Sequence, residues 1–183
     1  MTMLMKGNKM TFLELAKKRY TSRVFMPKPV SDEKIKIILE SARVAPTLGN
    51  TQSVRVIVIE EREDLRKLKL LLVTHDAPHV LLICGDMRKS FKYPAENIDS
   101  ALSDATVAAT HIILAAADVD IGSFWTMNFS PSKVKSAFKL PPSYQVFHII
   151  GIGTPVDKKS PTRHGLERLP LNNMVTFLNK KDS

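Results

Sequence analysis

Two arginines and two hydroxyl side chains lie within five residues, in the stretch Arg19-Tyr20-Thr21-Ser22-Arg23. An arginine side chain can bind a phosphate group through two parallel hydrogen bonds, and hydroxyl groups can satisfy the remaining phosphate oxygens. This stretch, called the basic turn below, is therefore a candidate phosphate site. Taken alone, such a string belongs more often to a solvated helix end, so the prediction depends on other parts of the chain.

A second candidate segment runs from Ala45 to Gln52, between an amphipathic helical pattern and a run of β-branched residues. It contains Pro46, Gly49 and Asn50, and it offers exposed backbone groups and side-chain amides. Such groups suit the polar edge of a planar heterocycle. The alternative interpretation is an ordinary helix-to-strand loop with a glycine turn.

Two other patterns resemble a dinucleotide-binding motif and a metal site, but both are incomplete. Gly151 and Gly153 have the spacing that opens a dinucleotide fingerprint, but Val156 stands where the third glycine belongs, so a Rossmann site is not expected. His75 and His79 are spaced like metal ligands on a helix, but no cluster of cysteines or carboxylates joins them. We therefore expect no metal site.

The chain of 183 residues carries a formal net charge of +9, which would attract an anionic partner. Its lysines and arginines are scattered, however, and no aromatic residues are interleaved with a basic run as base stacking requires. We therefore expect a solvated basic surface and no nucleic-acid partner.

Cysteine content and hydropathy bear on the cellular compartment. No apolar run reaches the roughly 18 residues that a membrane span needs, and residues 1–10 lack the continuous apolar segment of a signal peptide. The single cysteine, Cys84, excludes an intrachain disulfide and lies in an apolar run, so we expect a buried, unreactive thiol. A cytoplasmic protein with no membrane partner is the expectation.

The elements that must position the two candidate segments follow from residue spacing. Thr11 and Glu14 form a capping-box pattern, which predicts a helix to about residue 19 with Phe12, Leu15 and Ala16 facing inward. Ser31 and Ser130 are expected to cap later helices. The other predicted helices span 31–45, 63–72, 99–117 and the residues after 130, and the predicted strands span 54–59, 79–84, 121–126 and 145–152. The β-branched strand at 54–59 is expected to be mostly buried. Because strands and helices do not alternate strictly, this order favours an α+β fold over a doubly wound parallel sheet.

Five segments together resemble the nitroreductase family of FMN-dependent oxidoreductases, in the order and spacing of that family. Two are the candidate segments already described, the basic turn and the loop up to Gln52. The others are the alanine-rich helix leading into Asp120-Ile121-Gly122-Ser123-Phe124-Trp125, the strand end Gly151-Ile152-Gly153-Thr154-Pro155, and Arg168-Leu169-Pro170-Leu171.

The resemblance implies an architecture. It predicts a nitroreductase-like α+β sandwich, with a central, mostly antiparallel sheet flanked by helices, in an intertwined homodimer that holds FMN at the interface. Residues 11–178 would form a single FMN-binding domain that includes a C-terminal segment wrapping the partner. Residues 1–10 and 179–183 would be tails.

The resemblance also implies a binding site for FMN that draws on both subunits. The phosphate and ribityl chain would be held by Arg19, Tyr20, Thr21, Arg23 and Arg168. The flavin ring would be faced, from the other subunit, by Pro46, Thr47, Leu48 and Asn50. Met127 and Asn128 would occupy the turn whose backbone amide approaches flavin N5.

Such an enzyme would use its flavin rather than a catalytic side chain for the redox chemistry. Hydride would pass from NADH or NADPH to flavin N5, and electrons would then pass to a nitroaromatic, a quinone or a similar small-molecule acceptor, with ping-pong kinetics. The alternative is a non-catalytic protein that binds flavin or a nucleotide.

The sequence leaves three points open. Neither the physiological acceptor nor the preference between NADH and NADPH can be inferred from it. In addition, Leu65 to Asp76 is short, and Leu70 to Val73 is apolar, where the family often places polar contacts to the flavin. Those contacts are expected to be missing or replaced.

Overall fold

The computed structural model describes residues 10–94 and 98–178. The expected tails, residues 1–10 and 179–183, lie outside these residues except for Met10. The elements of the described chain are α1 (Phe12–Lys18), α2 (Asp32–Arg43), η1 (Leu48–Asn50), β1 (Val54–Ile59), α3 (Arg62–Lys69), β2 (His79–Asp86), α4 (Ala101–Asp118), β3 (Gly122–Thr126), α5 (Pro131–Ala137), β4 (Tyr144–Gly153), η2 (Pro161–Arg163), α6 (His164–Glu167) and η3 (Leu171–Asn173).

The strands form one sheet in the order β1-β2-β4-β3, and each neighbouring pair is antiparallel. The α+β class with an antiparallel sheet is thus confirmed. A register shift between Ile83 and Cys84 interrupts the β2–β4 ladder, where Ile83 lies opposite His148 and Cys84 lies opposite Val146.

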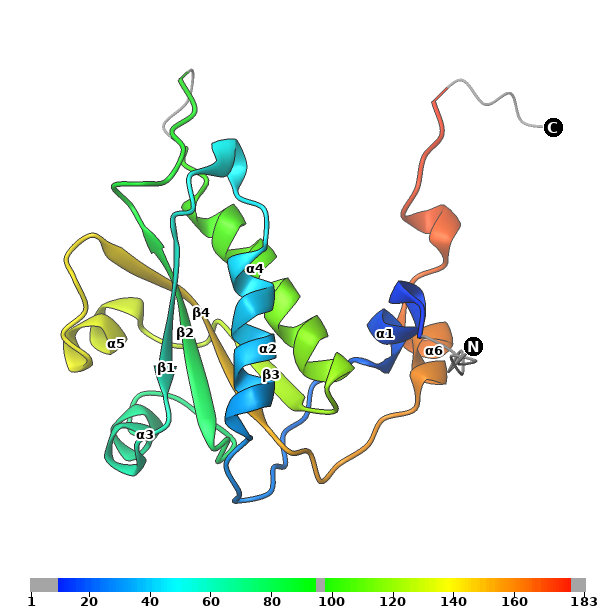
Figure 1. Ribbon diagram of the computed structural model, residues 1–183. Coiled ribbons are helices and arrows are strands. Elements are labelled where there is room, and N and C mark those ends of the chain that lie inside the picture. Colours follow the sequence, from blue (N-terminus) through cyan, green and yellow to red (C-terminus); the bar gives the residue numbers. More distant parts are fainter. Residues whose placement is uncertain (1–9, 95–97, 179–183) are drawn as a thin grey trace, which may run out of the picture.

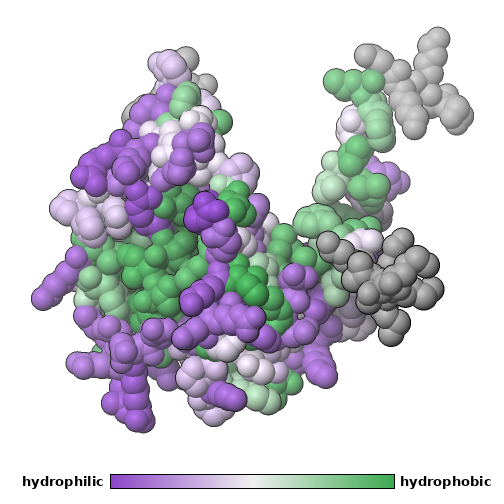
Figure 2. Space-filling view, viewed as in Figure 1, coloured by the Kyte–Doolittle hydropathy of each residue, from purple (hydrophilic) through white to green (hydrophobic). Residues whose placement is uncertain are grey.

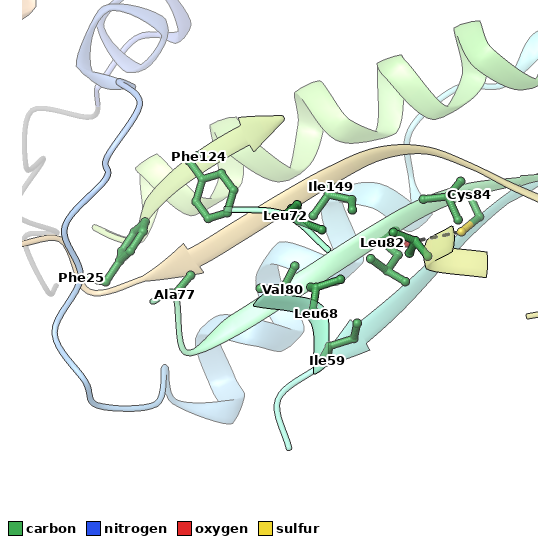
Figure 3. Packing of buried hydrophobic residues seen from close by; sticks show 12 residues of the cluster. Phe25, Ile59, Leu68, Leu72, Ala77, Val80, Leu82, Cys84, Phe124 and Ile149 are labelled. Carbon is green, nitrogen blue, oxygen red and sulfur yellow. Dashed lines mark hydrogen bonds between the residues drawn. The ribbon is translucent and has the colours of Figure 1, made fainter. Parts of the chain in front are cut away.

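Helices cover both faces of the sheet: α2 and α4 lie on one face, and α3 and α5 lie on the other (Figure 1). Strand β2 is buried along its whole length, and its side chains alternate between the two layers, as the pleat of a strand requires. Leu81 and Ile83 pack with Ile112 of α4, whereas Val80 and Leu82 pack with Leu68 of α3 (Figure 3).

Small side chains let α4 lie close to the sheet. Ala105, Ala108, Ala109 and Ala116 are all completely buried, so no long side chain separates the helix backbone from its neighbours. The alanine pattern in the sequence predicted this central helix, and the structure confirms it.

Two expectations about burial were wrong. Strand β1 was predicted to be mostly buried, but most of its residues are only half-buried because β1 is an edge strand that pairs with β2 alone. Phe12 was expected to face inward, but it is 72% exposed because α1 lies away from the sheet, beside α6 (Figure 1).

The predicted helix caps are partly confirmed. The capping box of α1 is present, with the Thr11 amide donating to Glu14 Oε2 at 2.7 Å. Ser31 and Ser130 do occupy the N-cap positions of α2 and α5, but neither side chain makes the capping hydrogen bond. The predicted N-cap positions of the two serines are thus confirmed, although neither hydroxyl group makes a capping bond.

The segment from Asp157 to Leu178, called the arm below, extends away from the sheet and its helices (Figure 1). Many of its residues are hydrophobic (Figure 2). Its exposed large apolar residues are Leu166, Leu169, Leu171, Met174, Val175, Phe177 and Leu178. None of the described helices has the length and hydropathy of a membrane span.

Candidate functional site

The basic turn is an extended segment fixed along the edge strand β3. Thr21 forms an isolated parallel bridge with Ser123, and the Ser22 amide donates to the Ser123 carbonyl oxygen at 2.9 Å. The buried Ser22 hydroxyl bonds to the carboxylate of Asp157. Because side chains alternate along an extended chain, burying Ser22 directs Thr21 and Arg23 to the opposite side.

Hydrogen bonds from the end of β4 and the start of the arm hold the same turn. The Met26 amide donates to the Thr154 carbonyl oxygen at 2.9 Å, and the Val156 amide donates to the Val24 carbonyl oxygen at 3.0 Å. The Tyr20 hydroxyl donates to the main-chain oxygen of Asp157. Burial raises the pKa of Tyr20, and the negative charge of Asp157 raises it further, so Tyr20 stays protonated and able to donate.

Positive charges gather at Arg19 without matching negative charges. Burial lowers the pKa of the Arg19 guanidinium, and the nearby positive charges of Arg163 and Arg168 lower it further. Within residues 10–94 and 98–178, the side chains of Arg19 and Arg168 have no hydrogen-bond or ion-pair partner, and the nearest carboxylate to Arg163, that of Glu167, is 4.0 Å away. A phosphate group, which carries negative charge and several acceptor oxygens, fits this arrangement.

Arg163 itself is a residue that the sequence analysis missed. Its guanidinium donates to the main-chain oxygens of Arg19 at 2.5 Å and Ser160 at 2.8 Å, and its side chain is only 13% exposed. It therefore ties the arm to the basic turn. No sequence motif marks it, because its bond to the basic turn is to a main-chain oxygen 144 positions earlier.

The two halves of the basic turn line different cavities. Arg19 and Tyr20 line a cavity of about 380 Å³ beside Lys18 and Lys158. Thr21 and Arg23 line a cavity of about 640 Å³, which is also lined by Leu71, Leu72, Val73, His75, Phe124, Trp125, Thr126, Asn128, Phe129 and Ser130. The structure thus brings Thr21, Arg23 and Asn128 together in the larger cavity, and Met127 stands beside it with 62% of its surface exposed.

The short segment before β2 contributes an imidazole to this larger cavity. His75 lies edge-on to Phe124 with ring centroids 5.0 Å apart. Both His75 and the following Asp76 have left-handed backbone conformations, with φ angles of 52° and 56°, which are uncommon for residues other than glycine. His75 was considered from the sequence only as a metal ligand, and the described residues hold no group of three possible metal ligands.

The other predicted ring-facing residues lie elsewhere in the same chain. Thr47 lines a third cavity, of about 590 Å³, between α2 and β1, together with Arg43, Arg55 and Lys89. No residue of the basic turn lines it. Within one chain, therefore, the structure does not bring Pro46, Thr47, Leu48 and Asn50 to the turn.

The backbone of this loop is tightly constrained. Gly49, Asn50 and Gln52 have left-handed φ angles of 59°, 53° and 50°. The Thr47 hydroxyl accepts from the Gln52 amide at 3.0 Å, and its carbonyl oxygen accepts from the Asn50 amide at 2.9 Å. The Leu48 amide donates to Asp104 Oδ1 of α4 at 2.9 Å. These bonds define the conformation of the loop backbone, which leaves Pro46, Leu48 and Asn50 exposed.

Comparison with known proteins assigns this chain to a family. The model of the nitroreductase family matches residues 16–74 and 66–154. A structure of a nitroreductase family protein from Clostridium difficile aligns with a TM-score of 0.90 and 35% identity, covering 93% of this chain and 99% of that one. The chain belongs to the nitroreductase family.

Relatives with more specific names are also similar. A protein of Archaeoglobus fulgidus, provisionally named an NADH dehydrogenase/NAD(P)H nitroreductase, is 31% identical over 155 residues, which cover 80% of this chain and 87% of that protein. An FMN reductase [NAD(P)H] of Bacillus subtilis is 26% identical, and the alignment covers 87% of this chain and 72% of that protein. A structure named FMN-dependent nitroreductase, from Clostridium difficile R20291, aligns with a TM-score of 0.76 and 25% identity over 90% of this chain and 98% of that one.

Proposed function

We propose that this protein is an FMN-dependent oxidoreductase that takes hydride from NADH or NADPH and passes electrons to a nitroaromatic, a quinone or a similar small acceptor. The observation that carries the proposal is the group of guanidiniums at Arg19, Arg163 and Arg168. Among the described residues, Arg19 and Arg168 have no ion-pair partner, and Arg163 has only Glu167, at 4.0 Å. The names of the relatives, which include an FMN reductase and an FMN-dependent nitroreductase, support the same cofactor.

The residues of one chain divide the binding of FMN between them. Arg19 and Arg168 would bind the phosphate, and Thr21 would donate its hydroxyl to a phosphate or ribityl oxygen. Arg23 would lie along the same cavity toward the ring. Asn128 and Met127 would supply the turn whose backbone approaches N5. His75 would take the place of the polar contacts that the apolar stretch Leu70 to Val73 lacks.

A homodimer would complete the site. Pro46, Thr47, Leu48 and Asn50 are separate from the basic turn within one chain, so they could face the ring only from a second copy. The arm favours the same conclusion, because it extends from the body with a row of exposed apolar side chains that a partner would cover. We include a cytoplasmic location in the proposal, which the buried free thiol of Cys84 supports.

The flavin, when bound, supplies the redox chemistry, accepting two electrons from the nicotinamide and releasing them to the acceptor. The protein then has to bind the flavin, orient it toward its substrates and shield it from water. The positive charge of Arg23 would favour a negatively charged reduced ring, and the rigid backbone of the cavity would hold donors in place without reorganisation. No side chain has to transfer a proton for hydride to move.

An anaerobic titration tests this proposal. Purified protein should be yellow with bound FMN, and its visible flavin absorption should bleach on addition of NADH or NADPH and return on addition of menadione or nitrofurazone. Protein that carries FMN but bleaches with neither nicotinamide would instead be a non-catalytic flavin-binding protein. Protein that binds no FMN would contradict the cofactor assignment itself.

A further inference from the structure

A buried carboxylate, that of Asp104, fixes the constrained loop to the central helix. Asp104 lies in the first turn of α4 and is 3% exposed. Its Oδ1 accepts from the Leu48 amide at 2.9 Å, and its Oδ2 accepts from the hydroxyls of Ser53 at 3.1 Å and Ser100 at 2.7 Å. Both oxygens are therefore used to hold groups of the surrounding chain.

A carboxylate at this buried position indicates that Asp104 does more than fill space. Burying a carboxylate is costly unless hydrogen bonds and opposite charges compensate for the lost water. Among the described residues no cation forms an ion pair with Asp104, so neutral donors and the positive end of the α4 dipole must supply the compensation. An apolar residue would avoid this cost if Asp104 only filled space.

The bonds to Asp104 grip the loop at both ends. Leu48 lies at the start of the left-handed turn, and Ser53 lies directly after it, at the entrance to β1. Between them, Asn50 and Gln52 are non-glycine residues in left-handed conformations. Such conformations persist only where the surroundings enforce them, and Asp104 provides the tertiary contacts that do so.

We propose that Asp104 is a positioning residue of the flavin site: by holding the Leu48 amide and the Ser53 hydroxyl, it fixes the loop of residues 46–52 in the conformation that faces the ring. This inference rests on the proposed function, since it takes the loop to face the flavin of a second copy. Asp104 itself is buried beneath the loop and would not touch the cofactor.

Two variants separate the geometric role of Asp104 from its charge. D104A removes every acceptor, whereas D104N removes the charge but keeps one oxygen to accept from the Leu48 amide. Its NH2 group would replace the oxygen that accepts from Ser53 and Ser100, and it could donate to these hydroxyls instead. If Asp104 acts by positioning, D104A should weaken FMN binding about tenfold and D104N should recover most of that loss. If its negative charge alone mattered, the two variants would be equally impaired. D118N, which neutralises an exposed aspartate at the other end of α4, is the matched control.

Hydrogen exchange of the apoprotein supplies a readout that does not depend on FMN or on turnover. In D104A the amides of residues 48–52 should exchange at least tenfold faster than in the wild type, while those of β2 and β4 keep their protection. Loop amides that exchange at the wild-type rate in D104A would overturn the proposal, even if the protein binds FMN and reduces it normally.

The flavin measurement completes the test. Loosening of the loop in D104A without any change in FMN affinity or in the visible circular dichroism of bound FMN would also overturn the proposal. S53A keeps the carboxylate and removes one of its hydrogen bonds to the loop. It should therefore show faster exchange of the loop amides and weaker FMN binding, both to a smaller extent than D104A. If D104A does not fold, S53A replaces it in the test. Wild-type protein that binds no FMN would refute the proposed function, and the exchange result would still decide whether Asp104 holds the loop.

Discussion

The guanidinium of Arg163 donates a hydrogen bond to the main-chain oxygen of Arg19 across 2.5 Å. A residue of the arm thus fixes the backbone of the residue that begins the basic turn, and it brings a second positive charge to it. The geometry of the proposed phosphate site therefore depends on the arm being docked.

Replacing Arg163 tests this dependence. R163A removes a mostly buried group that makes charge-assisted hydrogen bonds, each contributing about 1.5–3 kcal/mol. We expect FMN affinity to fall by at least tenfold, or about 1.4 kcal/mol, measured by quenching of FMN fluorescence on binding. R66A, which removes an exposed arginine of α3, should bind FMN as the wild type does. Equal affinity in R163A and R66A would contradict the docking role.

The hydroxyl of Thr21 has a more local role. T21V keeps the shape of the side chain and the main-chain bridge to Ser123, so the fold should be unaffected, and one hydrogen bond to the cofactor should be lost, at a cost of about 0.5–1.5 kcal/mol. FMN should bind several-fold more weakly, and T21S should bind it normally. Riboflavin, which keeps the ribityl chain but lacks the phosphate, identifies the partner of the hydroxyl. Equal binding of riboflavin by T21V and T21S would assign it to the phosphate, and a weaker binding by T21V would assign it to the ribityl chain.

Acid should weaken the fold through Asp86. This carboxylate accepts hydrogen bonds from the Arg88 side chain at 3.1 and 3.0 Å, and these contacts hold its pKa well below the ordinary value of 3.8. A depressed folded-state pKa adds stability above the unfolded-state pKa, and that stability is lost as the pH falls below about 4 toward the folded-state value.

The corresponding variant is D86N. Its midpoint in urea should be lower than that of the wild type at pH 7, and the difference should shrink as the pH falls from 5 to 2. Because Arg88 is largely exposed, added salt should screen part of the difference. A gap between the two midpoints that stays constant across this range would show that Asp86 contributes through something other than its charge.

The exposed apolar side chains of the arm should report on association. L169D places a charge on a side chain that is 77% exposed in the single chain and that a partner would bury, so it should shift the protein toward monomer and release FMN. Sedimentation velocity measures the first effect and visible absorption measures the second. L70D alters a comparably exposed apolar residue that lies outside the arm and does not line the larger cavity, and it should leave the mass in solution unchanged.

Much of the fold could be read from local patterns. The β-branched run predicted β1 with its observed bounds, Val54–Ile59, and the alanine spacing predicted α4. The basic turn and the loop to Gln52 could be recognised because each lies within a few consecutive residues. What local patterns could not supply was the order of strands in the sheet, which leaves β1 at an edge and half-exposed.

The missed residues share a physical cause. Arg163 and Asp104 act by bonding to main-chain groups far away in the sequence, and such partners leave no mark in residue type or spacing. The position of His75 at the larger cavity was not predicted, because it depends on a left-handed backbone conformation. The residue types of this segment do not indicate that conformation. The prediction that Phe12 faces inward was wrong for a different reason. The apolar spacing around Phe12 did indicate an amphipathic helix, but α1 does not pack on the sheet.

The separation of the basic turn from the loop of residues 46–52 has a genetic consequence. Under the proposed arrangement each site takes its turn from one copy and its loop from the other. A chain damaged only in the turn and a chain damaged only in the loop, each inactive by itself, would in a mixed pair build one site with both parts intact and one with neither. Co-expressing the two would restore activity by complementation, which a site built from a single chain could never show.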